Sequence, residues 1–438
     1  PGFVLREVAP SSIVADQQNL SLLEAPDQPL RRGEALIAAD GTLLALDREA
    51  QDLGQQAALT PVDGHGWLLA PTLVDPHSVL ESPLLGRAET LQSLATAAAA
   101  GGYGQVALLP WGEPARDHPE ALNLHWPEPM RLHQWGSLLT HGETVEQPPR
   151  LAAHGDLLNA GAVGLAGDAE LPPLGLIERS LQLGECSNHP LLLAPRQRQL
   201  AGGGLVRERV EALRGGWSVD PPSSETLPLA ALISLQQSHP LRRLVAMNLS
   251  THEATSALRS APHAPLATVH WWQLLQDCNS LNPAGIGWRL EPPLGAPQDR
   301  KALIEAVADG IITAVAVHHV ALDSEEDLLP IDQRRPGLAG HGAVLPLLYQ
   351  TLVQQGSWSL VQLWQALCWG PCTLLGQPAE RLSPGCRRWL LFDTEASWAW
   401  PTGGLGSRAA NQPLTAGSGL KGRIRASGLW APSNWTLA

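Results

Sequence analysis

Histidines that follow two apolar segments are the residues of this chain best placed for chemistry. His77 comes after an apolar run that ends in a turn-forming Asp75-Pro76 pair, and His318 and His319 close a second run. Imidazole is a common metal ligand and changes charge near neutral pH, so each position is a candidate for metal binding. Because successive side chains of a strand point to opposite faces, His318 and His319 cannot bind one ion together, and at most one faces a shared pocket.

The segments that precede these histidines belong to a series of expected buried strands. Apolar runs occur at residues 70–74, 105–109, 162–165, 190–194, 244–247, 267–270 and 312–317. Helical stretches lie between them, such as the alanine-rich residues 89–100, which Gly101-Gly102 ends. This alternation predicts a parallel sheet with crossover helices. In an α/β barrel such strands carry the reactive side chains at their C-terminal ends, where His77 stands.

Both ends of the chain are β-rich. Residues 34–39 and 42–46 flank Asp40-Gly41, a pair typical of a hairpin turn, and strand-like runs return at 388–393 and 420–425. A length of 438 residues is enough for one barrel with a small appended domain. We therefore expect a β layer made from both chain ends beside a central barrel.

Composition and charge limit the partners of this chain. With 44% apolar and 16% charged residues it reads as globular, and its formal net charge of -13 argues against nucleic acid or an anionic membrane as a partner. Neither a signal peptide nor an unbroken apolar stretch of membrane-spanning length is evident. We expect a soluble, cytoplasmic protein.

The cysteines are scattered and never spaced as C-x-x-C, so a disulfide framework or a zinc ribbon is not expected. We predict buried free thiols at Cys186, Cys278, Cys368, Cys372 and Cys386.

The Asp75-Pro76-His77 frame resembles the first barrel strand of dihydroorotases, which are cyclic amidohydrolases. Further segments resemble dihydroorotase motifs in the same chain order, at residues 97–103, 109–117, 222–225, 249–251, 291–294, 299–303, 309–310 and 411–414. Together they extend the resemblance from about residue 33 to the C-terminus. It implies an α/β fold, with an (α/β)8 amidohydrolase barrel at residues 71–384 and a small β-sandwich built from residues 1–70 and 385–438.

In dihydroorotases a metal pair at the barrel mouth activates water, and the resemblance indicates which positions of this chain correspond to the metal ligands. The first histidine is kept as His77, but the second position is Val79. Two more ligand positions are Ala194 and Asn248, and His318 replaces an aspartate that serves as ligand and general acid/base. Methyl and amide groups are poor ligands for transition metals. The resemblance therefore implies a mouth without its metal pair.

The position that bridges the two metals offers one alternative. A carbamylated lysine is excluded, because the only lysines, Lys301 and Lys421, match other segments. Asp168 resembles the aspartate that other members use. A mononuclear zinc site built from His77, His318 and Asp168 is then conceivable, since these side-chain types suit zinc.

The substrate-binding positions of dihydroorotases have changed as well. Glu81 replaces an arginine, Trp111 and Glu291 replace asparagines, and Leu322 replaces a histidine. We expect a dianionic carbamoyl aspartate to meet repulsion from Glu81 instead of a bidentate clamp.

Tryptophans stand at several of these altered positions. Trp271-Trp272 lies where the resemblance places Pro-His-His-Leu, and Trp111 lies where it places an asparagine. These rings either pack into the core volume that metal and ligand would otherwise fill, or they line an aromatic pocket for another small molecule.

The metal-ligand and substrate-binding side chains are lost while the fold is retained, and this favours a catalytically inactive dihydroorotase homologue. We expect such a protein to act as a structural or regulatory partner in pyrimidine biosynthesis. Some family members without metal ligands support aspartate carbamoyltransferase, so the resemblance makes that enzyme the first candidate partner, and a homo-oligomer is also expected. The alternatives are an active hydrolase of a cyclic amide and a small-molecule-sensing module.

Overall fold

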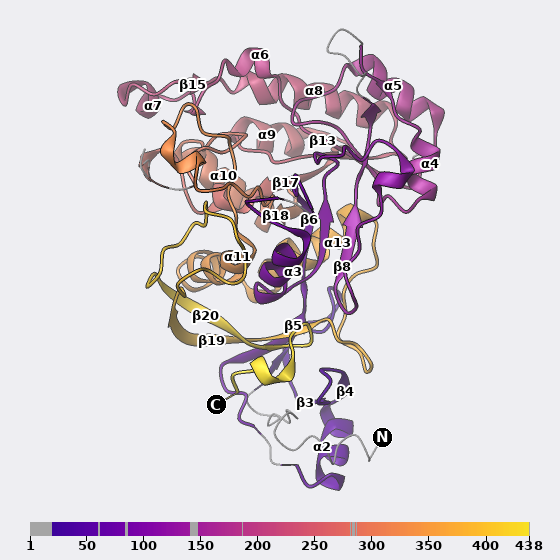
Figure 1. Ribbon diagram of the computed structural model, residues 1–438, viewed down its shortest axis with the longest axis vertical. Coiled ribbons are helices and arrows are strands. Elements are labelled where there is room, and N and C mark those ends of the chain that lie inside the picture. The colour runs from indigo at the N-terminus through magenta and orange to yellow at the C-terminus, as the bar shows by residue number, and fades with distance from the viewer. Residues whose placement is uncertain are drawn as a thin grey trace.

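The computed structural model describes residues 20–59, 62–83, 86–140, 148–185, 187–280, 282, 285 and 287–437. A barrel of parallel strands, with helices around it, fills the upper part of Figure 1, and a β layer lies below it.

Every neighbouring pair of strands in the barrel is parallel. The strands are β6 (Leu73–Ser78), β7 (Tyr103–Leu108), β8 (Arg131–Gln134), β9 (Gly136–Ser137), β12 (Leu165–Ala166), β13 (Pro190–Leu193), β16 (Arg243–Ala246), β17 (Leu266–His270) and β18 (Ala314–Ala316). Only Trp135 separates β8 from β9, so these two segments act as one strand and the ring has eight positions.

Backbone hydrogen bonds between the first and last strands close the ring. The His318 N–H donates to the His77 carbonyl at 3.1 Å, and the Val79 N–H donates to the His319 carbonyl at 2.8 Å. The strands and helices therefore form the (α/β)8 barrel that the resemblance implied, and the strand position made by β8 and β9 was missing from the predicted runs. The same two bonds bring both candidate histidine segments to one rim.

Helices cover the outside of the barrel (Figure 1). They are α3 (Leu91–Ala100), α4 (His154–Asn159), α5 (Leu174–Leu183), α8 (Ser223–Ser238), α9 (His252–Ser260), α10 (Pro297–Ala308), α11 (His341–Leu348), α12 (Leu360–Trp364) and α13 (Gly370–Leu375). The predicted helix over residues 89–100 corresponds to α3. It starts where it does because Thr90 and Ser93 each accept the other's backbone N–H, at 3.2 and 3.0 Å.

Shorter elements decorate the rim and interrupt the later helices. They are α6 (Arg198–Ala201), α7 (Val210–Arg214), β10 (Leu139–Thr140), β11 (Arg150–Leu151), β14 (Val206–Arg207), β15 (Val219–Asp220) and the π-helical turns Tyr349–Gln354 and Gln365–Trp369. No helix in the described ranges combines the length and apolar character that a membrane crossing requires.

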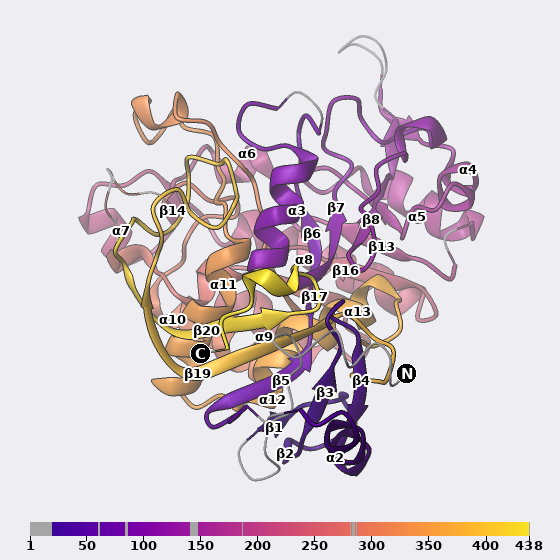
Figure 2. The same cartoon turned by 60° about the horizontal axis from the view of Figure 1, so that its bottom comes forward.

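The β layer joins the two ends of the chain. Its five-stranded sheet has the order β2 (Arg31–Arg32), β1 (Ser21–Leu22), β5 (Trp67–Pro71), β19 (Trp389–Ala399) and β20 (Gly419–Ser427). The pairing of β5 with β19 is antiparallel, and Figure 2 shows both strands side by side at the bottom of the barrel. The domain boundaries at residues 70 and 385 stay a prediction.

A second, two-stranded sheet completes this layer. β3 (Ala35–Ile37) and β4 (Leu43–Leu46) form the hairpin predicted around Asp40-Gly41, and α2 (Asp47–Gln56) follows it directly. The Asp40 side chain accepts the Thr42 N–H at 2.9 Å, which stabilises the turn.

The cysteines of the described chain are free thiols, as predicted. Cys278, Cys368 and Cys372 are buried and Cys386 is partly buried. Cys186 lies outside the described residues.

Candidate functional site

A cavity of about 300 Å³ lies at the C-terminal ends of the barrel strands. Among the residues that line it are Val79, Glu81, Trp111, Ala194, Arg196, Arg198, Asn248, His270, Glu291, His318 and Arg335. We call it the mouth cavity. Its place agrees with the rule that barrel sites form at this face.

His77 is fully buried below the mouth cavity, and both of its ring nitrogens are engaged inside the protein. Its Nδ1 lies 3.0 Å from Nδ1 of His318, and its Nε2 lies 2.9 Å from Oγ1 of Thr268. Thr268 also accepts the Asn248 N–H at 2.8 Å. Side-chain hydrogen bonds therefore link β6, β17 and the segment that follows β18.

His318 lines the mouth cavity, whereas His319 points the other way. The His319 ring is buried, with Nε2 3.2 Å from a carboxylate oxygen of Glu89. The prediction that only one of these neighbours faces the pocket is confirmed. Asn248 and His318 adopt φ values of 53° and 44°, a left-handed conformation that is uncommon for residues other than glycine and often marks functional sites.

His270 is a third histidine at the mouth, and the sequence reasoning missed it. It ends β17, so the signal that singled out His77, a position at the end of a buried strand, could have found it as well. The ring of His270 lies 6.0 Å from that of His318, edge to face. Its Nδ1 accepts the Trp272 N–H at 3.1 Å, which places the proton of the neutral ring on Nε2.

All three imidazoles are uncharged at neutral pH. Burial lowers the pKa of His318 to about 4. Burial, followed by the proximity of His318, also holds the pKa values of His77 and His270 well below the ordinary value for histidine. A histidine of so low a pKa is a weak base at pH 7.

The residues at the mouth do not fit the metal pair that the resemblance implies. The side chains of Val79 and Ala194 are hydrocarbon and that of Asn248 is an amide, and these groups are poor metal ligands. Both ring nitrogens of His77 already contact other protein groups. Asp168 is not among the lining residues. Among the described residues, the donor atoms of His77, His318 and Asp168 do not gather within 4.8 Å of one another, and the zinc set built from them stays a prediction.

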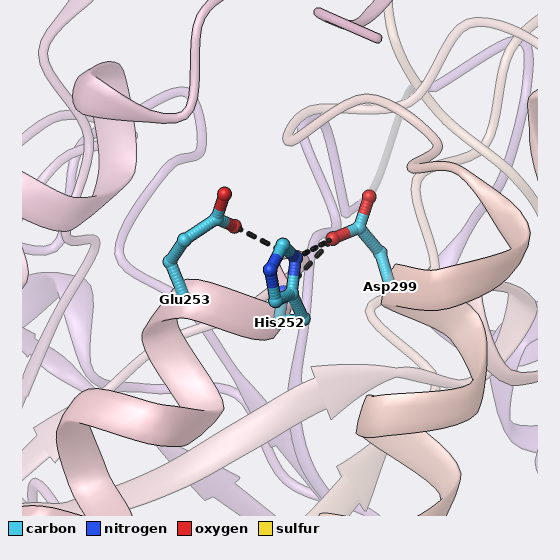
Figure 3. Close-up of side chains that lie close together, drawn as sticks. All are labelled: His252, Glu253 and Asp299. Atoms are coloured by element: carbon cyan, nitrogen blue, oxygen red, sulfur yellow. Dashed lines mark hydrogen bonds and ion pairs between the residues drawn. The ribbon is translucent and has the colours of Figure 1, made fainter. Parts of the chain in front are cut away.

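Within the described ranges, only His252, Glu253 and Asp299 form a group of three potential ligands with donor atoms within 4.8 Å of one another. Figure 3 shows the two carboxylates on either side of the imidazole. A guanidinium already bridges them, because Arg209 Nη2 donates to Glu253 at 3.0 Å and to Asp299 at 3.2 Å. Asp299 also accepts the Ala296 N–H at 2.9 Å. We interpret the group as an ion-pair network that joins the starts of α9 and α10.

Arginines on neighbouring loops offset the acidic residues at the mouth. Glu81 pairs with Arg335 at 2.7 Å, and Glu291 pairs with Arg196 at 2.9 Å and with Arg198 at 3.4 Å. The repulsion that we expect between Glu81 and a dianionic carbamoyl aspartate is reduced by Arg335, a partner that the sequence reasoning did not identify. No signal in the sequence joined Glu81 to Arg335, which lie 254 positions apart.

Two motifs that resemble the family meet in a buried network next to the cavity. Glu225 accepts the N–H and hydroxyl groups of Ser250 and Thr251 at 2.7–3.1 Å. The fully buried Arg207 donates to Glu225 at 2.6 Å and lies 3.1 Å from Asp220. These motifs therefore hold the scaffold together, which explains why they persist where the ligand positions do not.

The Asp75-Pro76-His77 frame and the C-terminal Asn411 have structural roles too. Asp75 accepts hydrogen bonds from the Val317 N–H at 3.0 Å and from His341 Nε2 at 2.9 Å. Asn411 accepts the Leu322 N–H at 2.9 Å, and its amide donates to Val320. Both residues fix the segment that carries His318.

The three tryptophans named from the sequence have different environments. Trp111 lines the mouth cavity, and its indole N–H donates to the Gly167 carbonyl at 2.9 Å. Trp271 is fully buried in the core, as the packing interpretation predicted. Trp272 lines a separate cavity beside Trp288. The environment of Trp271 agrees with the packing interpretation, and a binding role for Trp111 and Trp272 stays a prediction.

Known proteins resemble this chain along most of its length. A probable dihydroorotase-like protein of Synechocystis is 32% identical, over 89% of this chain and 94% of its own. A dihydroorotase-like protein of Pseudomonas aeruginosa is 30% identical, over 84% and 88%. The dihydroorotase of Bacillus subtilis is 27% identical, over 80% of each chain. No family model matches the sequence.

Solved structures agree on the fold. The L-hydantoinase of Arthrobacter aurescens superposes with a TM-score of 0.74 at 16% identity, over 95% of this chain and 94% of its own. The D-hydantoinase of a Thermus species gives 0.72 at the same identity and coverage.

Proposed function

The chain belongs to the dihydroorotase-like proteins of the cyclic amidohydrolase superfamily, and from this membership we propose that it serves as a non-catalytic structural or regulatory partner in pyrimidine biosynthesis. One observation carries the proposal. Both ring nitrogens of His77 are bonded to protein groups, and Val79 and Ala194 are hydrocarbon at positions where the resemblance to dihydroorotases implies metal ligands.

Hydrolysis of a cyclic amide needs an activated water and a proton carrier near it. A bound metal supplies the first by lowering the pKa of water to about 7, and an acid/base group with a pKa near the working pH supplies the second. At the mouth, the donor set does not fit a metal, and burial lowers the pKa of His318 to about 4. These residues support binding or scaffolding better than turnover.

Exposed apolar side chains support a protein partner. In the sequence they cluster between residues 174 and 241, on or beside α5, α6, α7 and α8; they are Leu174, Leu183, Leu200, Val210, Leu213, Leu227 and Leu241. Figure 1 shows these helices along one face, at the top of the molecule. Contiguous apolar patches on a surface mark interaction sites, and we propose that these side chains form one. We propose that this face binds aspartate carbamoyltransferase.

Size-exclusion chromatography tests the partnership. This protein and the aspartate carbamoyltransferase of the same organism, mixed at micromolar concentration, should elute in one shared peak. Leu213→Asp should abolish that peak, and Leu328→Asp, at an 84% exposed leucine outside the cluster, should leave it unchanged. Separate elution of the unmodified proteins would remove the proposal. Light scattering on this protein alone checks the expected homo-oligomer.

A turnover assay tests the inactive mouth independently. Protein dialysed against zinc should neither close carbamoyl aspartate nor open dihydroorotate. Chelator-sensitive turnover would instead establish the alternative, an active cyclic amide hydrolase, and would end the non-catalytic proposal.

The mouth cavity also favours a second candidate, a small-molecule sensor. Asn248 Oδ1 and His270 Nε2 are buried without a hydrogen-bond partner, and both side chains line the cavity. A ligand that rearranges the lining side chains could form hydrogen bonds with these two atoms. Such bonds would be favourable, because a buried polar atom without a hydrogen-bond partner costs free energy. A thermal-shift screen against pyrimidine intermediates tests this, with a rise of a few degrees expected on saturation.

A further inference from the structure

A second, larger cavity lies between the barrel and the β layer, with a volume of about 640 Å³. We call it the seam cavity. Its walls come from α3, α11, β19, β20 and residues 429–436, and it shares no lining residue with the mouth cavity. Figures 1 and 2 both show α3 and α11 against the β20 side of the sheet.

Three indoles give this cavity its apolar character. Trp126, Trp398 and Trp430 line it, and each donates its ring N–H to a backbone carbonyl, at 2.7–3.2 Å. Because these polar groups are satisfied, the rings offer the cavity only apolar contact. Phe392 and Met130 add to the same lining. Such walls suit an apolar or aromatic body.

Arg423 is the only charged side chain in the lining. Its guanidinium carbon lies 5.6 Å from the ring centre of Trp398, a cation–π contact. In the described part of the chain, no carboxylate lies within 4.0 Å of this guanidinium. Its neighbour Arg425, by contrast, pairs with Asp393 at 2.8 Å. A positive charge without a carboxylate partner therefore stands at an apolar cavity that holds no acidic residue.

We propose that the seam cavity binds a small apolar monocarboxylate, with its aromatic or aliphatic body among the indoles and its carboxylate on Arg423. The volume falls in the range of small-molecule sites. Charge complementarity selects an anion over an amine or a neutral alcohol of equal size. This site is separate from the proposed partner face and from the mouth, so it stands independently of the proposed function.

Binding would couple the two parts of the fold. One wall comes from the barrel helices α3 and α11, and the opposite wall comes from β19, β20 and the C-terminal segment. A ligand that contacts both walls should therefore raise the melting temperature of the whole chain, because it binds only the state in which they are docked.

Calorimetric titration with a matched set of probes tests the proposal. We expect 4-phenylbutyrate and dodecanoate to bind with dissociation constants on the order of 10–100 µM, and 4-phenylbutanol and 4-phenylbutylamine to bind several-fold more weakly. Arg423→Gln should weaken the two acids about three- to fivefold and leave the alcohol unchanged, as expected for an exposed ion pair. Arg214→Gln, at an exposed arginine of α7, is the matched control.

Blocking the cavity gives the second measurement. Ala99→Phe places a ring in the lining and should abolish binding of all probes in a chain whose melting temperature shows it to be folded. Equal binding of the acids and the amine, insensitivity to Arg423→Gln, or no heat at millimolar probe would each overturn the proposal. So would a concentration-dependent dimer of the unmodified chain that Ala99→Phe dissolves, since the occupant would then be a second copy.

Discussion

The Nδ1 atoms of His77 and His318 lie 3.0 Å apart. Two imidazoles at that distance share one proton, so one ring donates and the other accepts, and the pair links the first barrel strand to the segment that follows the last one. This relationship carries the first prediction.

Replacement of His77 should destabilise the protein. His77→Ala removes two buried hydrogen bonds and leaves a cavity in a fully buried site, so we expect a loss of about 2–4 kcal/mol in the free energy of unfolding. Urea unfolding measures it, with His125→Ala at an exposed histidine as the control. A change below about 0.5 kcal/mol, or a wild-type stability that depends on added zinc, would contradict the structural role.

Stability should fall as the pH is lowered from about 6.5 toward 4. The unfolded chain binds protons on its histidines at an ordinary pKa, whereas burial lowers the folded pKa of His318 and of His133 to about 4. The unfolded state therefore takes up protons first in this window, and stability rises with pH. Each such histidine contributes roughly 1 kcal/mol per pH unit.

Denaturant midpoints between pH 7.5 and 5 check this slope. His133→Gln should reduce it, and the exposed His125→Gln should not. Stability that stays flat over this range would show that the histidines charge freely in the folded state. Below pH 4.5 carboxylates add to the loss. Burial raises the pKa of Glu89, but hydrogen bonds from His319, Ser407 and Ser93 outweigh it and lower that pKa to about 2.

Removal of one charge from the buried network should be costly. Glu225→Gln leaves the fully buried Arg207 without its 2.6 Å carboxylate partner, and we expect a loss of roughly 3 kcal/mol. Glu253→Gln removes a partly exposed carboxylate from Arg209 and should cost about 1 kcal/mol or less. Thermal or urea unfolding of the two variants compares them directly. Equal losses of unfolding free energy in the two variants would mean that burial does not determine how much each ion pair contributes to stability.

Metal content should stay low. After dialysis against zinc and then buffer, we expect less than about a tenth of an ion per chain by atomic absorption, because the mouth offers no set of converging ligands. The dihydroorotase of Bacillus subtilis, treated in parallel, serves as a comparison. Close to one or two ions per chain would contradict the reading of the site.

The barrel and the β layer could be predicted because their signals are local. Apolar runs, Gly101-Gly102 and Asp40-Gly41 each act through neighbouring residues, and the structure places the corresponding strands, helix and turn where they were expected. His318 and His319 face opposite ways as predicted, but both follow the end of β18 and His318 has a left-handed backbone, so regular strand alternation is not the reason.

The composition of the mouth could be predicted only in part. Substitutions at Val79 and Ala194 were visible in the sequence, because each falls at a position fixed by neighbouring motif residues. The pairing of Glu81 with Arg335 was not, because it depends on two loops that meet only after the barrel closes. Asp168 shows the same limit, since its residue type did not reveal that its side chain lies outside the lining of the mouth cavity.

The sheet that joins β5 to β19 constrains how this polypeptide can be made and shortened. The interior strand β5 pairs with β19, which is synthesised more than three hundred residues later. A product that stopped before Trp389 would leave the backbone of β5 unpaired along one side, ready to join the strand edge of any other chain. Premature termination should therefore yield aggregates, not a smaller soluble barrel.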